Sequence, residues 1–176
     1  MSDLRVHKTK YINETKRVSF KYDGKNYFGY EGDTLASALL ANGVHLIGRS
    51  FKYHRPRGIM SCGSEEPNAI CQISDKNGLT EPNVRATELE IYDGLEAFSQ
   101  NCWPNVKFDI GGINNLISPL IPAGFYYKTF MWPKSFWKKV YEPLIRISAG
   151  LGKSPTEPDP DIYDHKYVHY DVLVIG

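Results

Sequence analysis

Two short segments of alternating apolar and polar residues, separated by Asp23-Gly24, constrain the fold of this chain most strongly. Residues 17–22 (RVSFKY) and 26–30 (NYFGY) alternate with a period of two, as half-buried strands do. The Asp-Gly pair favours the left-handed backbone conformation that a tight hairpin turn requires. The sequence therefore predicts a β-hairpin over residues 17–30.

A helix is predicted directly after the hairpin. Asp33 is suited to cap its amino terminus, and residues 34–42 place leucine and alanine on one face. Gly43 can end the helix in a left-handed conformation. The polar residues 1–16 show little pattern and predict a flexible arm.

Further strands are predicted after this helix. Residues 68–73 and 85–92 alternate as strands do, and turn dipeptides follow both segments. A hairpin, one helix and later strands indicate an α+β domain in which the helix crosses a mixed sheet. We expect this β-grasp domain to cover residues 17–98.

A basic and aromatic segment, residues 49–57 (RSFKYHRPR), lies between the helix and the later strands. One interpretation is a half-buried strand or loop in which Phe51 and Tyr53 point inward and the charges point outward. The other is an anchor against a neighbouring subunit or a cofactor phosphate, because the guanidinium fork of Arg55 or Arg57 suits both tasks.

Other polar residues near this segment carry weaker signals. His54 is expected at the surface, since the five histidines show no paired spacing of the kind that metal sites use. Glu65 and Glu66 are expected to be solvated; alternatively they pair with Arg55 or Arg57 and hold the shape of the loop. The sequence predicts no catalytic residue and no metal ligand.

The carboxyl-terminal part has a different character. Residues 99–169 predict a connecting region: an extended Trp- and Pro-rich arm over 103–133, a helix over 134–149 that Pro143 kinks or divides, and a proline-rich linker. Residues 170–176 (YDVLVIG) form a β-branched run that ends in Gly176, as the first strand of a Rossmann domain does. Gly176 is thus the candidate cofactor-binding residue.

The overall charge and the cysteine count limit the classes of function. A net charge of +1 makes the basic segment a local feature and argues against nucleic-acid binding by the whole surface. No apolar stretch approaches the roughly 20 residues of a membrane span, and the start has no apolar signal core. Three cysteines, an odd number, fit a reducing compartment. We expect a soluble, cytoplasmic protein without a membrane or nucleic-acid partner.

Several blocks together resemble one family. RSFKYHRPRGI, GSEEPNA, ATELEIYDGL, NCWP, FYYKTFMWP and DVLVIG are similar to the amino-terminal part of the alpha subunit of heterotetrameric sarcosine oxidase, over about residues 17–176. The resemblance implies a ferredoxin-like domain, a connecting arm and a truncated NAD-binding Rossmann domain whose first glycine is Gly176. It also implies other subunits as partners, FAD and FMN in the full complex, and tetrahydrofolate as the one-carbon acceptor.

The family resemblance also implies what the assembly does. Such a complex oxidatively demethylates sarcosine to glycine, forms hydrogen peroxide, and passes the one-carbon unit to tetrahydrofolate. The segment in hand would then serve as scaffold and interface and would not contain the catalytic site.

The spacing of the cysteines differs from that of a plant-type iron–sulfur site. Plant-type 2Fe–2S domains hold the cluster with C-x₄-C-x₂-C and a distant fourth cysteine. Cys62, Cys71 and Cys102 have the wrong short spacing and number only three. The sequence therefore predicts that a 2Fe–2S cluster is unlikely. Two alternatives stay open: a stand-alone 2Fe–2S electron-transfer domain, and a single-stranded nucleic-acid-binding module in which bases stack on Phe51 and Tyr53.

Overall fold

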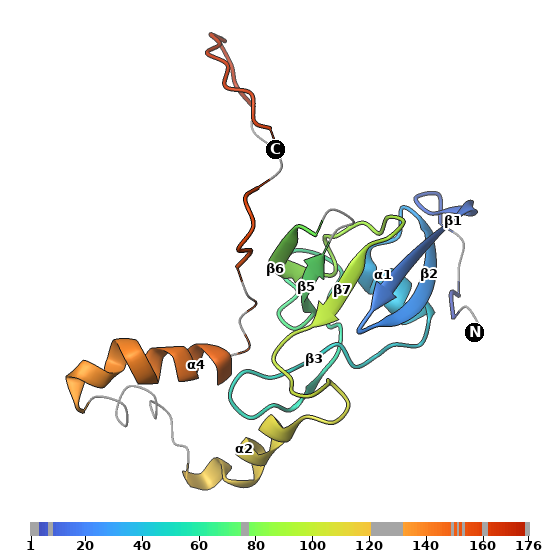
Figure 1. The fold of residues 1–176 in the computed structure, drawn as a ribbon. Helices are drawn as coiled ribbons and strands as arrows, with labels where there is room; N and C mark the ends of the chain where they lie inside the picture. The colour runs from blue at the N-terminus through green and yellow to red at the C-terminus, as the bar shows by residue number, and fades with distance from the viewer. Residues whose placement is uncertain are drawn as a thin grey trace.

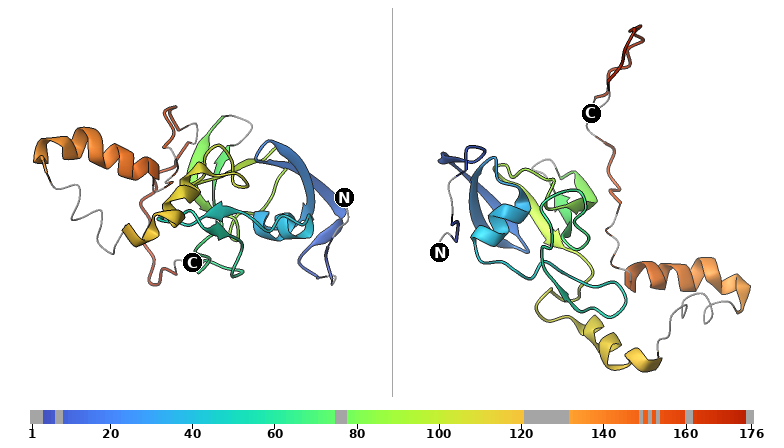
Figure 2. Two further views of the ribbon diagram at one scale, coloured as in Figure 1. Left: turned by 90° about the horizontal axis from the view of Figure 1, so that it is seen from below. Right: turned by 180° about the vertical axis from the view of Figure 1, so that it is seen from behind.

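The computed structural model describes residues 4–6, 9–74, 78–120, 132–148, 150, 152, 154–159 and 162–174. A five-stranded mixed sheet has the order β2-β1-β7-β5-β6, and one helix, α1, lies against one of its faces (Figures 1 and 2). β1 and β7 pair in parallel, and the other neighbours pair antiparallel. A mixed sheet crossed by one helix is the arrangement that the sequence predicted. The elements are β1 (Asn13–Tyr22), β2 (Lys25–Glu31), α1 (Leu35–Ala41), β5 (Ile70–Ser74), β6 (Thr80–Arg85) and β7 (Glu96–Ser99).

The amino-terminal hairpin is confirmed. β1 and β2 pair antiparallel, with Phe20 opposite Tyr27. Asp23 and Gly24 have φ values of 47° and 73°, the left-handed pair that a tight hairpin turn uses. The flexible arm predicted over residues 1–16 is too long, however, because residues 13–16 belong to β1. The other domain boundaries stay predictions.

The helix α1 is capped differently from the prediction. Thr34 is the N-cap, and its side-chain oxygen accepts a hydrogen bond from the Ser37 amide at 3.2 Å. The carboxylate of Asp33 is buried and accepts from the Tyr30 amide and the Ser37 hydroxyl at 2.9 and 2.7 Å, and it pairs with Arg5. Asp33 therefore joins the hairpin, the helix and the amino-terminal segment instead of capping the helix.

The strand predicted over residues 85–92 is wrong. β6 ends at Arg85, and the chain then turns beneath the start of α1. There the carbonyls of Ala86 and Leu89 accept from the amides of Ala36 and Leu35, both at 2.8 Å. Amides in the first turn of a helix have no acceptor inside the helix, so the carbonyls of this segment supply their hydrogen bonds. The segment does not form a strand of its own, and β7 completes the five-stranded sheet.

One apolar core fills the space between α1 and the sheet. Val18, Phe20 and Tyr22 enter it from β1, as alternation predicted. The other buried members are Leu35, Ala36, Ala38, Leu39, Ile47, Ala69, Cys71, Ile73, Ala86, Ile91, Leu95 and Ala97. The core is continuous from the first hairpin to β7, so these residues fold as one body.

The carboxyl-terminal region consists of short helical segments. The first part holds η1 (Ile110–Gly112), α2 (Ile113–Leu116) and η2 (Ser118–Leu120), and the second holds η3 (Lys134–Phe136), a π-helical turn η4 (Trp137–Tyr141) and α4 (Glu142–Ser148). The extended arm is therefore not confirmed, and residues 121–131 lie outside the described part. The change from π to α geometry beside Pro143 agrees with a divided helix, since proline cannot donate to the preceding turn.

The described residues of the tail, 162–174, extend beyond the sheet and then turn back on themselves (Figure 1). Residues 170–174 are exposed and form neither a strand nor a helix. The Rossmann strand is thus not confirmed, because a strand needs a hydrogen-bonded neighbour. Gly176 lies outside the described residues, and its cofactor role stays a prediction. Among the residues that the structure describes, no helix has both the length and the apolar character needed to cross a membrane.

Candidate functional site

The basic segment folds into a small hairpin beside the main sheet. Its strands are β3 (Gly48–Arg49) and β4 (Pro56–Arg57), and Ser50 and Arg55 continue the pairing through a 2.8 Å backbone hydrogen bond. Phe51 at the tip is 55% exposed, so the expectation that it points inward is wrong. The reason is that the segment turns back on itself instead of running on as one half-buried strand.

Arg49 fastens this hairpin to the segment that follows β7. Its guanidinium donates from Nε to the Val106 carbonyl at 2.8 Å and from Nη2 to the Lys107 carbonyl at 3.0 Å. A third contact of 3.3 Å reaches the His54 carbonyl within the hairpin. A cation that donates to three carbonyls is a structural clamp, and its donors are largely committed.

His54 forms a second clamp, against expectation. It is only 8% exposed, and its Nδ1 lies 2.7 Å from Oδ2 of Asp109. The other oxygen of Asp109 accepts from the amides of Trp103 and Gly111 at 3.0 and 3.2 Å. The surface position predicted for His54 is wrong because a partner 55 residues later covers it. Sequence reasoning missed Asp109, whose signal was an acidic residue two positions before the Gly111-Gly112 pair.

Two of the three remaining cations of the hairpin, Lys52 and Arg55, contact aromatic or amide groups. The charged groups of Lys52 and Arg55 lie 5.0 and 4.9 Å from the ring centre of Tyr53, within the range of cation–π attraction. Arg55 also donates to Oδ1 of Asn115 at 2.9 Å. Arg57 is exposed and has no hydrogen bond or ion pair from its side chain to any described residue.

Glu66 organises the loop between β4 and β5. It is 2% exposed, and its carboxylate accepts from the backbone amides of Met60, Ser61, Asn68 and Ala69 at 2.7, 2.6, 2.7 and 3.2 Å. Burial acts to raise the pKa of Glu66, but the four amide donors outweigh it and hold the pKa below its ordinary value.

Neither of the two alternatives for Glu66 is therefore correct. The carboxylate is not solvated, and it accepts hydrogen bonds from four backbone amides instead of pairing with Arg55 or Arg57. It does hold the shape of the loop, as the second alternative proposed, through donors that sequence patterns do not reveal. Glu65, its neighbour, is exposed as predicted.

The three thiols occupy different environments. Cys62 is exposed, Cys71 is buried and Cys102 is half-buried. Burial raises the pKa of the Cys71 thiol to about 12, and it also raises the pKa of Cys102, whose Sγ lies 3.4 Å from the Ser99 hydroxyl. Within the described residues, no three cysteine, histidine, aspartate or glutamate side chains gather in a group that could hold a metal ion. These thiols do not fit a four-thiolate site.

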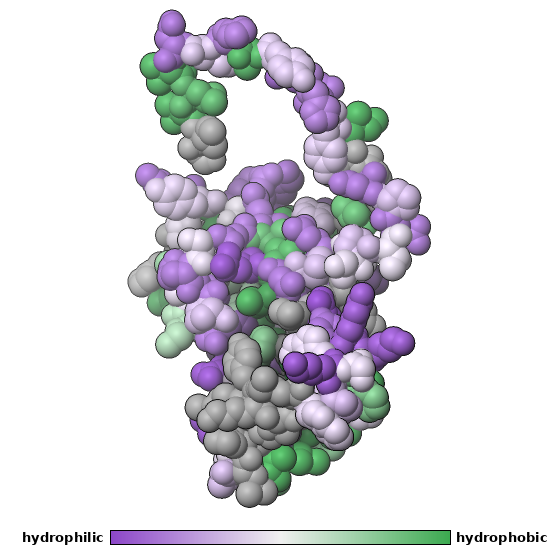
Figure 3. Space-filling model, turned by 90° about the vertical axis from the view of Figure 1, so that its left-hand side faces the viewer, coloured by the Kyte–Doolittle hydropathy of each residue, from purple (hydrophilic) through white to green (hydrophobic). Residues whose placement is uncertain are grey.

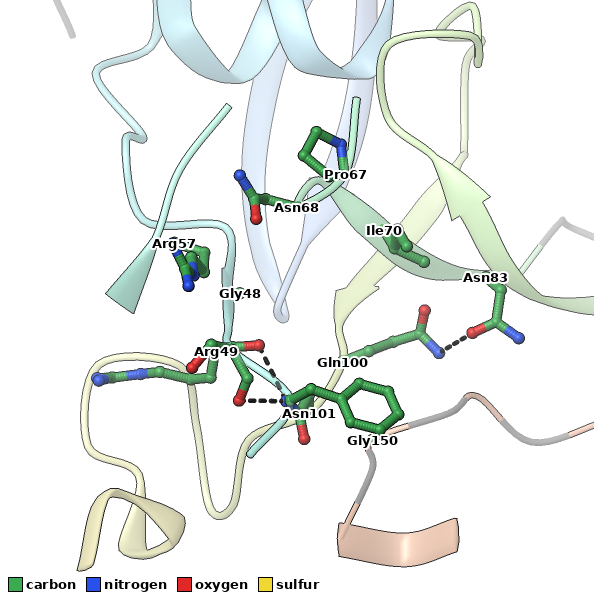
Figure 4. Close-up of a pocket in the computed structure, with 12 residues that line it drawn as sticks. Gly48, Arg49, Arg57, Pro67, Asn68, Ile70, Asn83, Gln100, Asn101 and Gly150 are labelled. Carbon is green, nitrogen blue, oxygen red and sulfur yellow. Dashed lines mark hydrogen bonds between the residues drawn. The ribbon is translucent and has the colours of Figure 1, made fainter. Parts of the chain in front are cut away.

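A pocket of about 260 Å³ opens where the β3–β4 hairpin meets the main sheet (Figure 4). Asn101 forms part of its wall, and its side-chain amide donates to the carbonyls of Arg49 and Ser50, both at 2.9 Å. The pocket residues that bear on function are Arg49, Phe51, Arg57, Asn68, Asn83 and Gln100. The described residues thus place polar and cationic groups around one cavity.

The chain matches one known family and resembles full-length relatives. The family described as "2Fe-2S iron-sulfur cluster binding domain" matches residues 15–102. Over all 176 residues the chain is 57% identical to sarcosine oxidase subunit alpha of Rhizobium meliloti (strain 1021), and covers 18% of that protein. Over 167 residues it is 30% identical to sarcosine oxidase subunit alpha of Corynebacterium sp. (strain U-96), and covers 12% of it. The chain thus spans less than a fifth of the length of these relatives.

A solved structure shows a weaker likeness. The crystal structure of L-proline dehydrogenase from P. horikoshii aligns with a TM-score of 0.40 and 24% identity, over 53% of this chain and 17% of that one. At this level the likeness supports no inference about this chain.

The expectation that a 2Fe–2S cluster is unlikely is contradicted. The family that matches residues 15–102 is described by its binding of such a cluster. The sequence analysis predicted the ferredoxin-like domain, but it treated the plant-type cysteine spacing as the test of whether a cluster is bound. The described thiols do not gather at one place, so no electron-transfer step is assigned to a cluster in this chain.

Adjacent glycines test the His54 clamp. A Cβ added at Gly111 would lie 2.3 Å from Nδ1 of His54, whereas one at Gly112 would meet nothing within 4 Å. Gly111→Ala should displace the ring from Asp109 and lower the free energy of unfolding by about 1–3 kcal/mol, the usual cost of overpacking. Gly112→Ala, the control, should change it by less than about 0.5 kcal/mol. Urea unfolding measures both, and equal losses would contradict the clamp.

Adjacent glutamates test the role of Glu66. Because its pKa is lowered in the folded state, its carboxylate stabilises the fold above the ordinary value of 4.5, and that stability is lost as the pH falls through the folded pKa. Glu66→Gln should lower the free energy of unfolding by about 2 kcal/mol at pH 7 and by much less at pH 3. Glu65→Gln should be nearly neutral at both pH values. A pH-independent loss would disprove the assignment.

Proposed function

This chain belongs to the family of 2Fe-2S iron-sulfur cluster binding domains, and on that premise we propose that it is a scaffold and interface segment of an oxidoreductase subunit of the sarcosine oxidase type. The observation that carries the proposal is 57% identity to a sarcosine oxidase alpha subunit over the whole chain. Identity of this degree spans the β-grasp sheet and the region after it, so both parts support the same assignment.

The proposed assembly oxidises sarcosine. A flavin elsewhere in the assembly would accept two electrons from the N-methyl C–N bond and pass them to oxygen, which would give hydrogen peroxide and glycine. The one-carbon unit passes to tetrahydrofolate as a methylene group. Further subunits, in a heterotetramer, would complete the enzyme.

The described residues support a structural role within that assembly. The buried carboxylates Asp33, Glu66 and Asp109 are each committed to backbone or side-chain hydrogen bonds that hold the fold. Buried acids with satisfied oxygens stabilise structure and have no free position for a substrate proton. These three acids therefore have structural roles, and our proposal assigns the catalytic groups of the reaction to other parts of the assembly.

An exposed apolar stripe supports the interface role. Phe136, Val140 and Leu144 recur every four residues along the helical segment, and are 49%, 38% and 57% exposed. This helical segment lies apart from the sheet (Figure 1). The tail, residues 162–174, also exposes apolar side chains, drawn green in Figure 3. Exposed apolar faces of this kind mark contact surfaces. In the proposed assembly, another part of the oxidoreductase would cover the stripe.

The proposal predicts both activity and assembly. Purification through a tag on this chain, from cells that make the complete complex, should yield sarcosine-dependent hydrogen peroxide and glycine. Leu144→Ser should weaken assembly about tenfold to a hundredfold, because burial of a leucine side chain contributes about 1.5–3 kcal/mol. Lys138→Ser on the same segment is the control and should leave assembly unchanged. No sarcosine-dependent peroxide from the intact complex would refute the function.

The family description favours a second function, that of a domain carrying a 2Fe–2S cluster. This alternative predicts about two irons and two acid-labile sulfides per chain in protein purified without oxygen. Iron and sulfide analysis measures this directly. Iron below a tenth of that amount would exclude the alternative, and it would leave the sarcosine assay unaffected.

A further inference from the structure

The pocket beside the β3–β4 hairpin has an uneven distribution of charge. Its lining includes two arginines and four side-chain amides, and none of the described residues that line it is acidic. Cationic groups around a small cavity attract anions, and low-dielectric walls strengthen that attraction. The pocket is therefore electrostatically suited to a negatively charged group.

The two arginines differ in what they can still bind. Arg49 donates to three carbonyls, and its side chain extends away from the other lining residues, so it offers few free donors to the pocket (Figure 4). The side chain of Arg57 has no partner among the described residues and is exposed to solvent. A guanidinium fork binds phosphate or carboxylate oxygens in two parallel contacts. Arg57 is thus the residue that can hold an incoming oxyanion.

The wall that carries Arg57 is held in place before any ligand arrives. The Arg57 carbonyl accepts from the Ile47 amide at 2.9 Å, and β4 pairs with β3 through Gly48. On the other side of the pocket, the side-chain amide of Asn101 bonds the carbonyls of Arg49 and Ser50 (Figure 4). A preformed site loses less conformational freedom on binding, which favours affinity.

The size of the cavity limits the ligand. About 260 Å³ is below the range of roughly 300–1,000 Å³ that encloses drug-sized molecules. The cavity suits a small anion or the charged end of a larger molecule. Asn68 offers side-chain amide hydrogens, since its Nδ2 makes only a weak contact of 3.9 Å with the Met60 sulfur among the described residues. Phe51 presents an exposed ring at the edge.

We propose that this pocket is an oxyanion-binding site, in which Arg57 holds a phosphate or carboxylate group and Asn68 donates a further hydrogen bond. The inference goes beyond the proposed function and holds whatever reaction the assembly performs. Phosphate and carboxylate share the required chemistry of planar-fork recognition by arginine, and the two sources differ in charge and in the number of oxygens.

Calorimetric titration tests the site on the purified protein at constant ionic strength, with sodium phosphate and sodium acetate as separate probes. Arg57→Gln should weaken binding of the preferred anion about tenfold, the effect of losing one charge-assisted contact. Arg85→Gln is the matched control, because Arg85 is also an exposed strand arginine, and it should change binding less than twofold. Arg57→Lys should give an intermediate value, since it keeps the charge and loses the fork.

The two probes separate the sources. Binding of phosphate alone assigns the site to a phosphate group, and comparable binding of acetate assigns it to carboxylates in general. The proposal is overturned if neither anion binds the unaltered protein, or if Arg57→Gln binds as well as Arg85→Gln. Circular dichroism of each variant confirms that the fold is retained. None of these readouts depends on sarcosine turnover, so failure here is distinct from failure of the proposed function.

Discussion

The parallel pairing of β1 with β7 is the constraint on which the rest of the structure depends. Lys21 lies opposite Glu96, so strands far apart in the chain meet at the centre of the sheet. Parallel neighbours cannot be joined by a tight turn, so everything between them must cross the sheet and return. The connection between β1 and β7 contains α1, the β3–β4 hairpin and the β5–β6 pair. These elements share one apolar core.

Local patterns in the sequence predicted the parts of this fold that local physics decides. Asp23-Gly24 and the flanking alternation specify the hairpin because turn geometry and side-chain direction act within a few residues. The alternation in residues 85–92 gave a wrong strand prediction because it is also a local pattern. The carbonyls of Ala86 and Leu89 accept hydrogen bonds from amides of α1, which is distant in sequence. Hydrogen bonds between residues so far apart in the chain produce no periodic pattern in the sequence.

The candidate site was predicted less well than the fold. The cationic residues of the hairpin were identified, yet His54, Glu66 and Asp109 take their character from burial, which composition does not reveal. His54 is covered by a carboxylate from beyond β7, and Glu66 by four amides of its own loop. A charged residue is stable in the interior only when its polar atoms have hydrogen-bond partners. Those partners can be identified only from the three-dimensional structure.

The apolar stripe along Phe136, Val140 and Leu144 also matters before the protein is assembled. A chain whose stripe is not covered exposes these apolar side chains to other proteins. Exposed apolar surface promotes aggregation and is recognised by chaperones and proteases. Cellular quality control would therefore remove orphan copies.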